Sequence, residues 1–159
     1  FNLVSGGFGV PIERLREFRK TFDETITDAA RRSSIRVSTQ RPVYVTTDES
    51  ELPAIVEQAR WNMRVTLSLR QGLQRVEKGR AIAVPFDNEP TEEELLERYF
   101  VMGTPEACAA KIRQIQEVMG INHFNASFWF GDLPQEKVLR SMTLFAEEVM
   151  PALQQEAAA

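Results

Sequence analysis

The residues best suited to bind an anion lie at the start of the chain. Ser5 is followed by Gly6-Gly7-Phe8-Gly9 and then by Pro11, which suits the first turn of a helix. Glycine allows backbone amides to approach an anion at a helix N-terminus. The segment lacks the Lys-Ser/Thr of a P-loop and the GxGxxG spacing of a dinucleotide fold, so an ordinary turn between a strand and a helix is favoured over a phosphate site.

A second group of residues ends the last predicted strand, residues 121–130. Trp129 and Phe130 lie beside Gly131 at the end of this strand, where aromatic side chains could line an apolar ligand. Ordinary packing beneath the final helix explains the same two residues equally well. The pair is therefore a candidate for binding, not for catalysis.

The polar residues of the same strand share one face. His123 lies near the start of the strand and is expected to be a structural hydrogen-bonding residue rather than a base, with Asn125 and Ser127 beside it. This face either points into a closed interior or meets solvent if the sheet is open. Cys108 lies on the apolar stripe of a predicted helix and is expected to pack in the core. The acidic run at residues 92–94 is interpreted as a solvated first helical turn.

Composition excludes several classes of function. The 159 residues carry a net charge of -4, which argues against a protein that binds nucleic acid through a basic face. A single cysteine excludes an internal disulfide, and a single histidine excludes His-rich zinc and di-iron sites, so no metal is expected. No apolar run approaches the roughly 20 residues that cross a bilayer, and the N-terminus lacks the regions of a secretory signal. We expect a soluble, cytoplasmic protein with no membrane partner.

Apolar periodicity predicts helices and strands in alternation. A helix is expected from Pro11, a strand over residues 35–46 with Pro42 indicating a weakened or edge position, and a long helix from Asp48 to about Val76. A loop over residues 77–90 follows, and it is longer than a compact domain usually keeps without a use for it.

Further helix signals occupy the second half of the chain. Thr91 and Glu94 predict a capping box, Thr104-Pro105 a helix start, and Gly120 the end of that helix. The last helix is expected to bury four residues on one face and to end or kink at Pro151. The four are Val138, Met142, Phe145 and Val149.

This alternation indicates βα units with parallel strands. Three such strands with helices on one side are incomplete, because parallel sheets are normally covered on both faces or closed into a barrel. The chain also begins with Phe1 in what reads as the end of a strand. The pattern therefore predicts a fragment of a larger barrel or sheet.

The last third of the chain resembles the C-terminal end of the bacterial-luciferase-like flavin-dependent monooxygenases. The stretch from Val101 to Leu153 carries the resemblance through four short motifs. These are Gly103-Thr104-Pro105-Glu106, Gly120-Ile121, Ser141-Met142-Thr143-Leu144-Phe145 and Val149-Met150-Pro151. The match is looser upstream, where residues 41–51 resemble the family's seventh strand and the following helix start, and residues 1–9 resemble its sixth strand.

The resemblance implies a fold and a set of site residues. Members of the family are TIM (β/α)8 barrels, so residues 1–159 are expected to be the last three or so βα units, without the earlier five. A barrel needs about 250 residues, so this chain does not close one alone. By this resemblance Ser5 lies near the flavin; Gly6 and Gly7 beside it are candidates to bind the cofactor, and Trp129 and Phe130 are candidates to line the substrate.

The same resemblance implies a lid and a reaction. The loop 77–90 takes the place of the family's mobile lid, where Lys78 or Arg80 would meet an anionic group on closure. Reduced FMN from a separate flavin reductase would react with O2 to oxygenate a small organic substrate. The catalytic residue stays unassigned because the strands that hold it in the family are absent, and the fragment alone is expected to be inactive.

Two alternatives remain open. The fold also binds deazaflavin cofactors, which carry out hydride transfer instead of oxygenation. The second alternative is a non-catalytic fragment that assembles through exposed strand edges, as a homo-oligomer.

Overall fold

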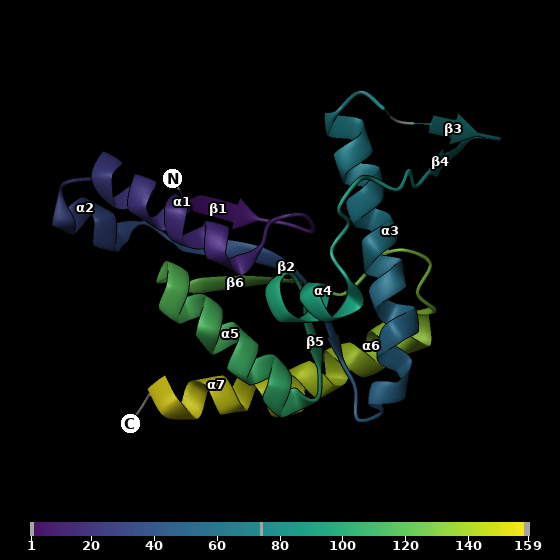
Figure 1. Ribbon diagram of the computed structural model, residues 1–159. Coiled ribbons are helices and arrows are strands. Elements are labelled where there is room, and N and C mark those ends of the chain that lie inside the picture. Colours follow the sequence, from purple (N-terminus) through teal and green to yellow (C-terminus); the bar gives the residue numbers. More distant parts are fainter. Residues whose placement is uncertain (1, 74, 158–159) are drawn as a thin grey trace.

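The computed structural model describes residues 2–73 and 75–157. Its centre is a four-stranded sheet in which all the paired strands are parallel (Figure 1). The strands of this sheet are β1 (Leu3–Gly6), β2 (Val37–Val45), β5 (Val101–Gly103) and β6 (His123–Ser127). β2 is central: residues 37–40 pair with β1, residues 38–42 with β6 and residues 43–45 with β5. The predicted α/β class with parallel strands is confirmed, and β5 is a strand that the sequence pattern did not reveal.

The helices alternate with these strands along the chain. They are α1 (Ile12–Thr25), α2 (Ala29–Ser34), α3 (Leu52–Arg70), α4 (Glu92–Arg98), α5 (Pro105–Met119), α6 (Gln135–Leu144) and α7 (Met150–Ala157). A 3-10 turn, Glu49–Glu51, precedes α3, and a π-helical segment, Phe145–Val149, joins α6 to α7.

The predicted helix ends are present. Thr91 Oγ1 accepts a hydrogen bond from Glu94 N–H and Glu94 Oε2 accepts one from Thr91 N–H, which completes the capping box of α4. Thr104 caps α5 through the N–H of Ala107, and Gly120 ends that helix in the left-handed conformation at a φ of 62°. These local signals fix where α4 and α5 begin and end.

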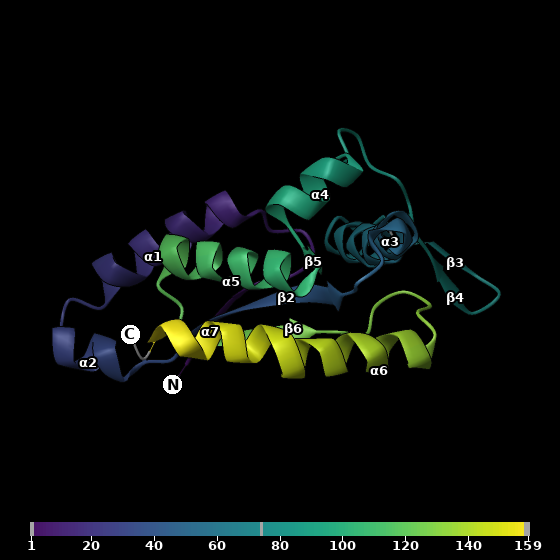
Figure 2. The same cartoon turned by 90° about the horizontal axis from the view of Figure 1, so that it is seen from below.

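The apolar side chains form two cores. In the first, α1, α5 and α7 pack against one face of the sheet, with Leu15, Val43 and Ile115 among its fully buried members. Figure 2 shows α1 and α5 side by side on this face, and α7 and the π-helical segment also contact α5. In the second core, Tyr44 and Phe130 pack against α3. Both ribbon views place α3 beyond the carboxyl end of β2.

Of the two positions predicted for Pro42, an edge strand is wrong, because β2 is the central strand, and a weakened position is confirmed. The pairing with β1 ends at Gln40 and the pairing with β5 begins at Val43, so Pro42 is in register with Ser127 of β6 alone. A missing N–H is tolerated in a central strand where the neighbouring strand changes in this way.

The prediction that the second helix continues to Val76 is also wrong. α3 ends at Arg70, and Gly72, at a φ of 68°, follows it. Leu73 N–H donates to Ser68 O and Gly72 N–H to Leu69 O, which is the hydrogen-bond pattern of a Schellman motif. The glycine therefore ends the helix.

A β-hairpin takes the place of the end of that helix and the start of the expected loop. Its strands are β3 (Arg75–Glu77) and β4 (Arg80–Ile82), paired antiparallel. Lys78 and Gly79 have φ values of 50° and 77°, which suit a tight two-residue turn. The hairpin projects from the body of the molecule in both ribbon views.

The last helix differs from its prediction at two positions. Met142 is 44% exposed, whereas Ser141 is buried and its Oγ accepts a hydrogen bond from Val45 N–H at 2.8 Å. Pro151 does not end the helix, since α7 continues through it directly after the π-helical segment. Proline has no N–H to donate to the carbonyl four residues earlier. The different hydrogen-bond pattern of a π-helical turn lets the helix continue through it.

Candidate functional site

Helices cover one face of the sheet, whereas residues on the other face are exposed or half-buried. Leu3, Val37 and Phe124 belong to the face packed against α1, α5 and α7. The opposite face carries Val4, which is 60% exposed, together with exposed Gln40 and His123 and half-buried Asn125 and Ser127. Asn125 Nδ2 donates to Ser38 Oγ at 3.3 Å on this side. We call the residues Val4, Gln40, His123, Asn125 and Ser127 the open face.

The structure separates the three residues expected to bind a cofactor. Ser5 lies on the covered face, where its Oγ donates to Met119 Sδ at 3.3 Å. Gly6 packs closely on β2, because a Cβ at this position would collide with Thr39 Oγ1. Gly7 differs from both: its φ is 118° and a Cβ there would meet open space. Gly7 is therefore the residue of this group that a ligand can approach.

The glycine turn also delivers an aromatic ring to the second core. Phe8 packs edge-to-face on Phe100 and Phe130, with ring centroids 6.5 and 6.1 Å apart. Trp129 is 65% exposed, whereas Phe130 is 1% exposed. The two candidate substrate-lining residues thus lie in different environments, and Trp129 is the one that offers a ring to a ligand.

The segment after β6 is held against α3. Gly131 N–H donates to Asn62 Oδ1 at 3.1 Å, and Asp132 N–H donates to Gln58 Oε1 at 2.7 Å. A pocket of about 610 Å³ lies beside these contacts. Its lining residues are Gln58, Trp61, Arg80, Ala81, Ile82, Gly131 and Asp132.

This pocket brings together the hairpin and the loop that follows β6. Arg80, a predicted lid residue, is in its lining, whereas Lys78 lies in the exposed turn of the hairpin. Trp61 supplies an exposed ring from α3. Sequence reasoning missed Gln58 and Trp61, which lie off the apolar stripe of α3; an exposed tryptophan on the polar side of a helix is a signal that could have pointed to Trp61.

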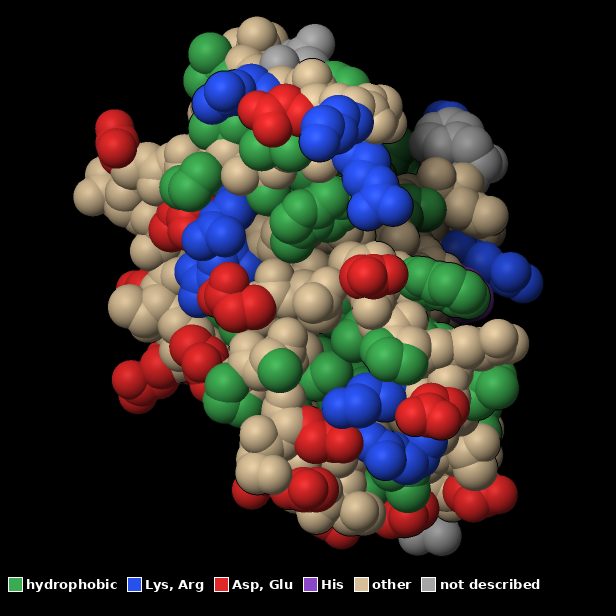
Figure 3. Space-filling view, turned by 90° about the vertical axis from the view of Figure 1, so that its right-hand side faces the viewer, with side chains coloured by type: hydrophobic (Ala, Val, Ile, Leu, Met, Phe, Trp, Pro, Cys, Tyr) green, Lys and Arg blue, Asp and Glu red, His purple; other side chains and the backbone are tan. Residues whose placement is uncertain are grey.

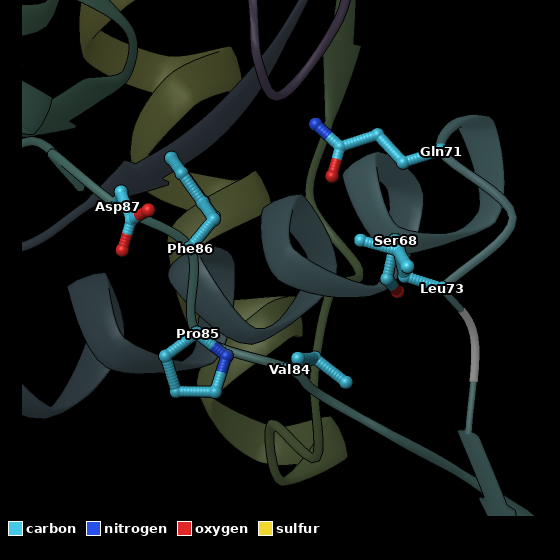
Figure 4. A pocket seen from close by; sticks show the side chains of 7 residues that line it. All are labelled: Ser68, Gln71, Leu73, Val84, Pro85, Phe86 and Asp87. Atoms are coloured by element: carbon cyan, nitrogen blue, oxygen red, sulfur yellow. The ribbon is translucent and has the colours of Figure 1, made fainter.

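An ion pair attaches the rest of the expected loop, residues 83–90, to α3. Arg64 Nε and Nη2 donate to Glu89 Oε1 and Oε2 at 2.7 and 2.6 Å, and these bonds lower the pKa of Glu89. Arg60 Nη1 donates to Pro90 O. A second pocket, of about 340 Å³, lies between residues 84–87 and the end of α3, with Ser68 and Gln71 on its helical side (Figure 4).

A cluster of charges marks the carboxyl end of β2. Glu51 accepts hydrogen bonds from Tyr44 Oη at 2.8 Å, from Arg140 Nη2 at 2.6 and 2.8 Å and from Lys137 Nζ at 3.2 Å. The Arg140 guanidinium, followed by the Tyr44 hydroxyl, lowers the pKa of Glu51 to about 2. Each group in this cluster has a partner, so the cluster joins the start of α3 to α6.

Arg41 is a residue that sequence reasoning missed. It lies on the covered face of β2 and is 0% exposed. Its Nη1 donates to the carbonyl oxygens of Gly7 and Tyr99 at 3.4 and 3.5 Å and to that of Val10. Burial lowers the pKa of Arg41 to about 10. An arginine among the valines and threonines of an alternating strand was the available signal.

Charge on the surface is mixed. On the face formed by α3 and the hairpin, lysine and arginine side chains lie next to aspartate and glutamate in small clusters (Figure 3).

Cys108 is buried, and burial raises the pKa of its thiol to about 12, in keeping with its expected packing role. Within residues 2–73 and 75–157, no helix combines the length and apolarity needed to cross a membrane.

Comparison with known proteins shows a likeness of fold to solved structures. Neither a family model nor a curated protein sequence matches the chain. The monooxygenase RslO1 from Streptomyces bottropensis matches 95% of this chain with a TM-score of 0.64 and 19% identity. The long-chain alkane monooxygenase LadA matches 94% with a TM-score of 0.56 and 16% identity.

The length of these matches is also informative. This chain spans 41% of the RslO1 chain and 36% of the LadA chain. The fold is thus that of part of two monooxygenase structures, which agrees with the resemblance found in the sequence and with a partial barrel.

Proposed function

We propose that this chain is part of a flavin-dependent oxidoreductase of the monooxygenase type. Reduced FMN from a separate flavin reductase, together with O2, would oxygenate a small organic substrate. The observation that carries this proposal is a parallel sheet with one open face, in a fold shared with two monooxygenases over nearly the whole chain. In a barrel this face would be the packed interior, so a ligand would lie where the face meets the carboxyl ends of the strands, beside Gly7 and the exposed Trp129.

Some of the residues present fit such a cofactor. Exposed Trp129 can stack on a flat ring, Gly7 leaves room for a close approach, and Gln40 and Asn125 offer amides on the open face. Ser5 fits less well, since its hydroxyl would first have to leave Met119. The bound flavin would supply the oxygen chemistry, while these residues orient it.

The hairpin and the segment 83–90 would act as the lid. Arg80 lines the pocket beside Gly131 and Asp132, so it can meet an anionic group of a substrate there. Exclusion of water by a lid protects reactive oxygen chemistry from side reactions. Lys78, at the hairpin turn, would make contact only if the hairpin moved toward the body.

A binding experiment tests the proposal. FMN is titrated into the protein, oxidised in air and reduced under argon, and flavin fluorescence and absorbance are followed. We expect saturable binding that the substitution Trp129→Ala weakens roughly tenfold, as loss of aromatic stacking would. The control Leu139→Ala removes an exposed apolar side chain of α6 that lines none of these pockets, and it should leave the affinity unchanged. Absence of saturable binding, or equal affinity in Trp129→Ala, would contradict the proposal.

The same titration separates the two cofactor alternatives. A deazaflavin has its own visible spectrum, so competition between it and FMN for the protein identifies the preferred ring. If the deazaflavin binds more tightly than FMN, the proposed reaction is hydride transfer and not oxygenation.

A second candidate function is assembly, because β1 leaves a groove along its free side. Among the described strands β1 pairs only with β2. A groove of about 760 Å³ runs between β1 and α1, lined by residues 3–6 and by Phe18, Phe22 and Ile26. β6 also pairs only with β2 among these strands, so a second copy could place its β6 beside β1 and continue the parallel sheet.

Light scattering across a concentration series tests this assembly. We expect a mass that rises with concentration, and the substitution Val4→Lys should lower it because a charge would enter the groove. The exposed control Leu139→Lys on α6 should have no effect. A constant monomer mass at high concentration would contradict assembly and leave the flavin proposal unaffected.

A further inference from the structure

Arg41 is a buried cation whose hydrogen-bonding capacity is only partly used. Its Nη1 reaches three main-chain carbonyls, whereas Nε and Nη2 have no hydrogen-bond partner among residues 2–73 and 75–157. The described residues also place no carboxylate within ion-pair distance of it. Leaving charged donors buried and unsatisfied is costly, so a site of this kind calls for an explanation.

The two unused atoms are the pair that makes a two-point contact with an oxyanion. Nε–H and Nη2–H of a guanidinium point in the same direction and match the two oxygens of a carboxylate or phosphate. The same chain contains the completed version of this contact. Arg64 uses Nε and Nη2 to hold both oxygens of Glu89 at 2.7 and 2.6 Å.

A second buried polar atom without a hydrogen-bond partner among the described residues belongs to Thr39, on the same strand as Arg41. Thr39 lies two residues earlier on the same face of β2, and its Oγ1 also has no partner among the described residues. Gly6 packs against this hydroxyl, so the turn after β1 covers both side chains. A hydroxyl and a guanidinium edge together form a set of donors suited to a small oxyanion.

A route to the site exists through the turn that covers it. Val10, whose carbonyl accepts from Arg41, and Gly6 both line the groove beside β1. Gly6 and Gly7 have φ values of 102° and 118°, which other residues rarely adopt, and a Cβ on Gly7 would meet open space. Movement of residues 6–10 would therefore expose the guanidinium to the groove.

We propose that Arg41, with Thr39, is an oxyanion-binding site that takes a phosphate or carboxylate group through Nε and Nη2. This inference is independent of flavin binding on the open face, because Arg41 lies on the covered face. The site would hold the anionic group of a ligand whose remainder occupies the groove beside β1.

The test follows the Nε–H resonance of Arg41 by NMR, assigned from its loss in Arg41→Lys. Inorganic phosphate and sodium acetate are titrated separately, with sodium chloride at equal ionic strength as the reference. We expect a saturable shift with phosphate or with acetate and none with chloride, and the anion that saturates first identifies the preferred group. Equal responses to all three salts, or no response, would overturn the proposal and indicate water at the site.

Thermal unfolding of two variants gives an independent readout. Arg41→Met removes a charge that lacks a carboxylate partner, so without added anion its melting temperature should equal or exceed that of the wild type. Its affinity for the preferred anion should fall roughly tenfold or more.

The matched control is Arg60→Met. Arg60 is also buried, but it pairs with Glu57 and donates to Pro90 O, so this variant should melt at a lower temperature and keep the anion response. A loss of stability in Arg41→Met as large as in Arg60→Met, or an unchanged anion response, would show that Arg41 is structural and overturn the proposal.

Discussion

The backbone of Gly131 lies directly against Gln58 of α3. A Cβ on Gly131 would be 2.7 Å from Gln58 Cβ and 2.9 Å from Gln58 O, and the φ of Gly131 is 61°. The chain can leave β6 and pass along α3 only because this residue has no side chain. The contact fixes the position of the loop that lines the pocket with Arg80.

The substitution Gly131→Ala should therefore destabilise the protein. Steric overlap with Gln58 adds to the cost of a left-handed alanine, and together they predict a loss of about 2 kcal/mol or more. Urea unfolding measures it. Gly79→Ala is the matched control, because its φ is 77° but a Cβ there would meet nothing within 4 Å; it should cost about 1 kcal/mol. Equal losses in the two variants would contradict the close contact with Gln58.

The ion pair between Arg64 and Glu89 should order the segment 83–90. Glu89 Oε1 also accepts a hydrogen bond from Phe86 N–H at 3.1 Å, so one carboxylate holds both the loop and α3. Glu89→Ala should speed hydrogen exchange at the Phe86 amide and lower stability by about 1–2 kcal/mol. Glu93→Ala, at an exposed position on α4, should change neither; unchanged exchange at Phe86 in Glu89→Ala would count against this role.

Glu51 should make stability depend on pH. Its pKa, about 2 in the folded protein, lies below the usual 4.5, so its contribution is fully present above about 4.5 and is lost as the pH falls through about 2. Glu51→Gln should reduce stability by about 2 kcal/mol at pH 6, and the difference from the wild type should shrink toward pH 2.

The control for this pH dependence is Glu49→Gln in the same 3-10 turn, where the side chain is exposed. It should follow the wild-type curve throughout. A wild-type advantage over Glu51→Gln that stays constant from pH 6 to pH 2 would refute a depressed pKa at Glu51.

Local signals in the sequence predicted much of the fold. The capping residues Thr91 and Thr104 and the terminal Gly120 act within one helical turn of themselves, so their effect can be inferred without knowledge of distant contacts. The alternation that predicted β2 is likewise local. The end of α3 depended on a single residue, Gly72, whose left-handed φ the apolar periodicity does not reveal.

The candidate site was harder to predict because it depends on pairings between distant segments. Ser5 was placed at the correct strand end, but its face is set by the register of Leu3 with Val37, which no local pattern specifies. Arg41 was visible in the sequence as an arginine in an alternating strand, but only the fold shows that its Nε and Nη2 have no hydrogen-bond partner among the described residues. Pro42 correctly indicated a weakened position, but the sequence could not show that a change of neighbouring strands, rather than an edge, accommodates it.

The measurement that most directly tests the central claim is a map of FMN contacts on the protein by NMR. Addition of FMN should shift the side-chain amides of Gln40 and Asn125 and the indole N–H of Trp129, which lie on or beside the open face. The methyl group of Met119, on the covered face next to Ser5, should not move. Shifts confined to Met119 and its neighbours, or none at saturating FMN, would contradict the account.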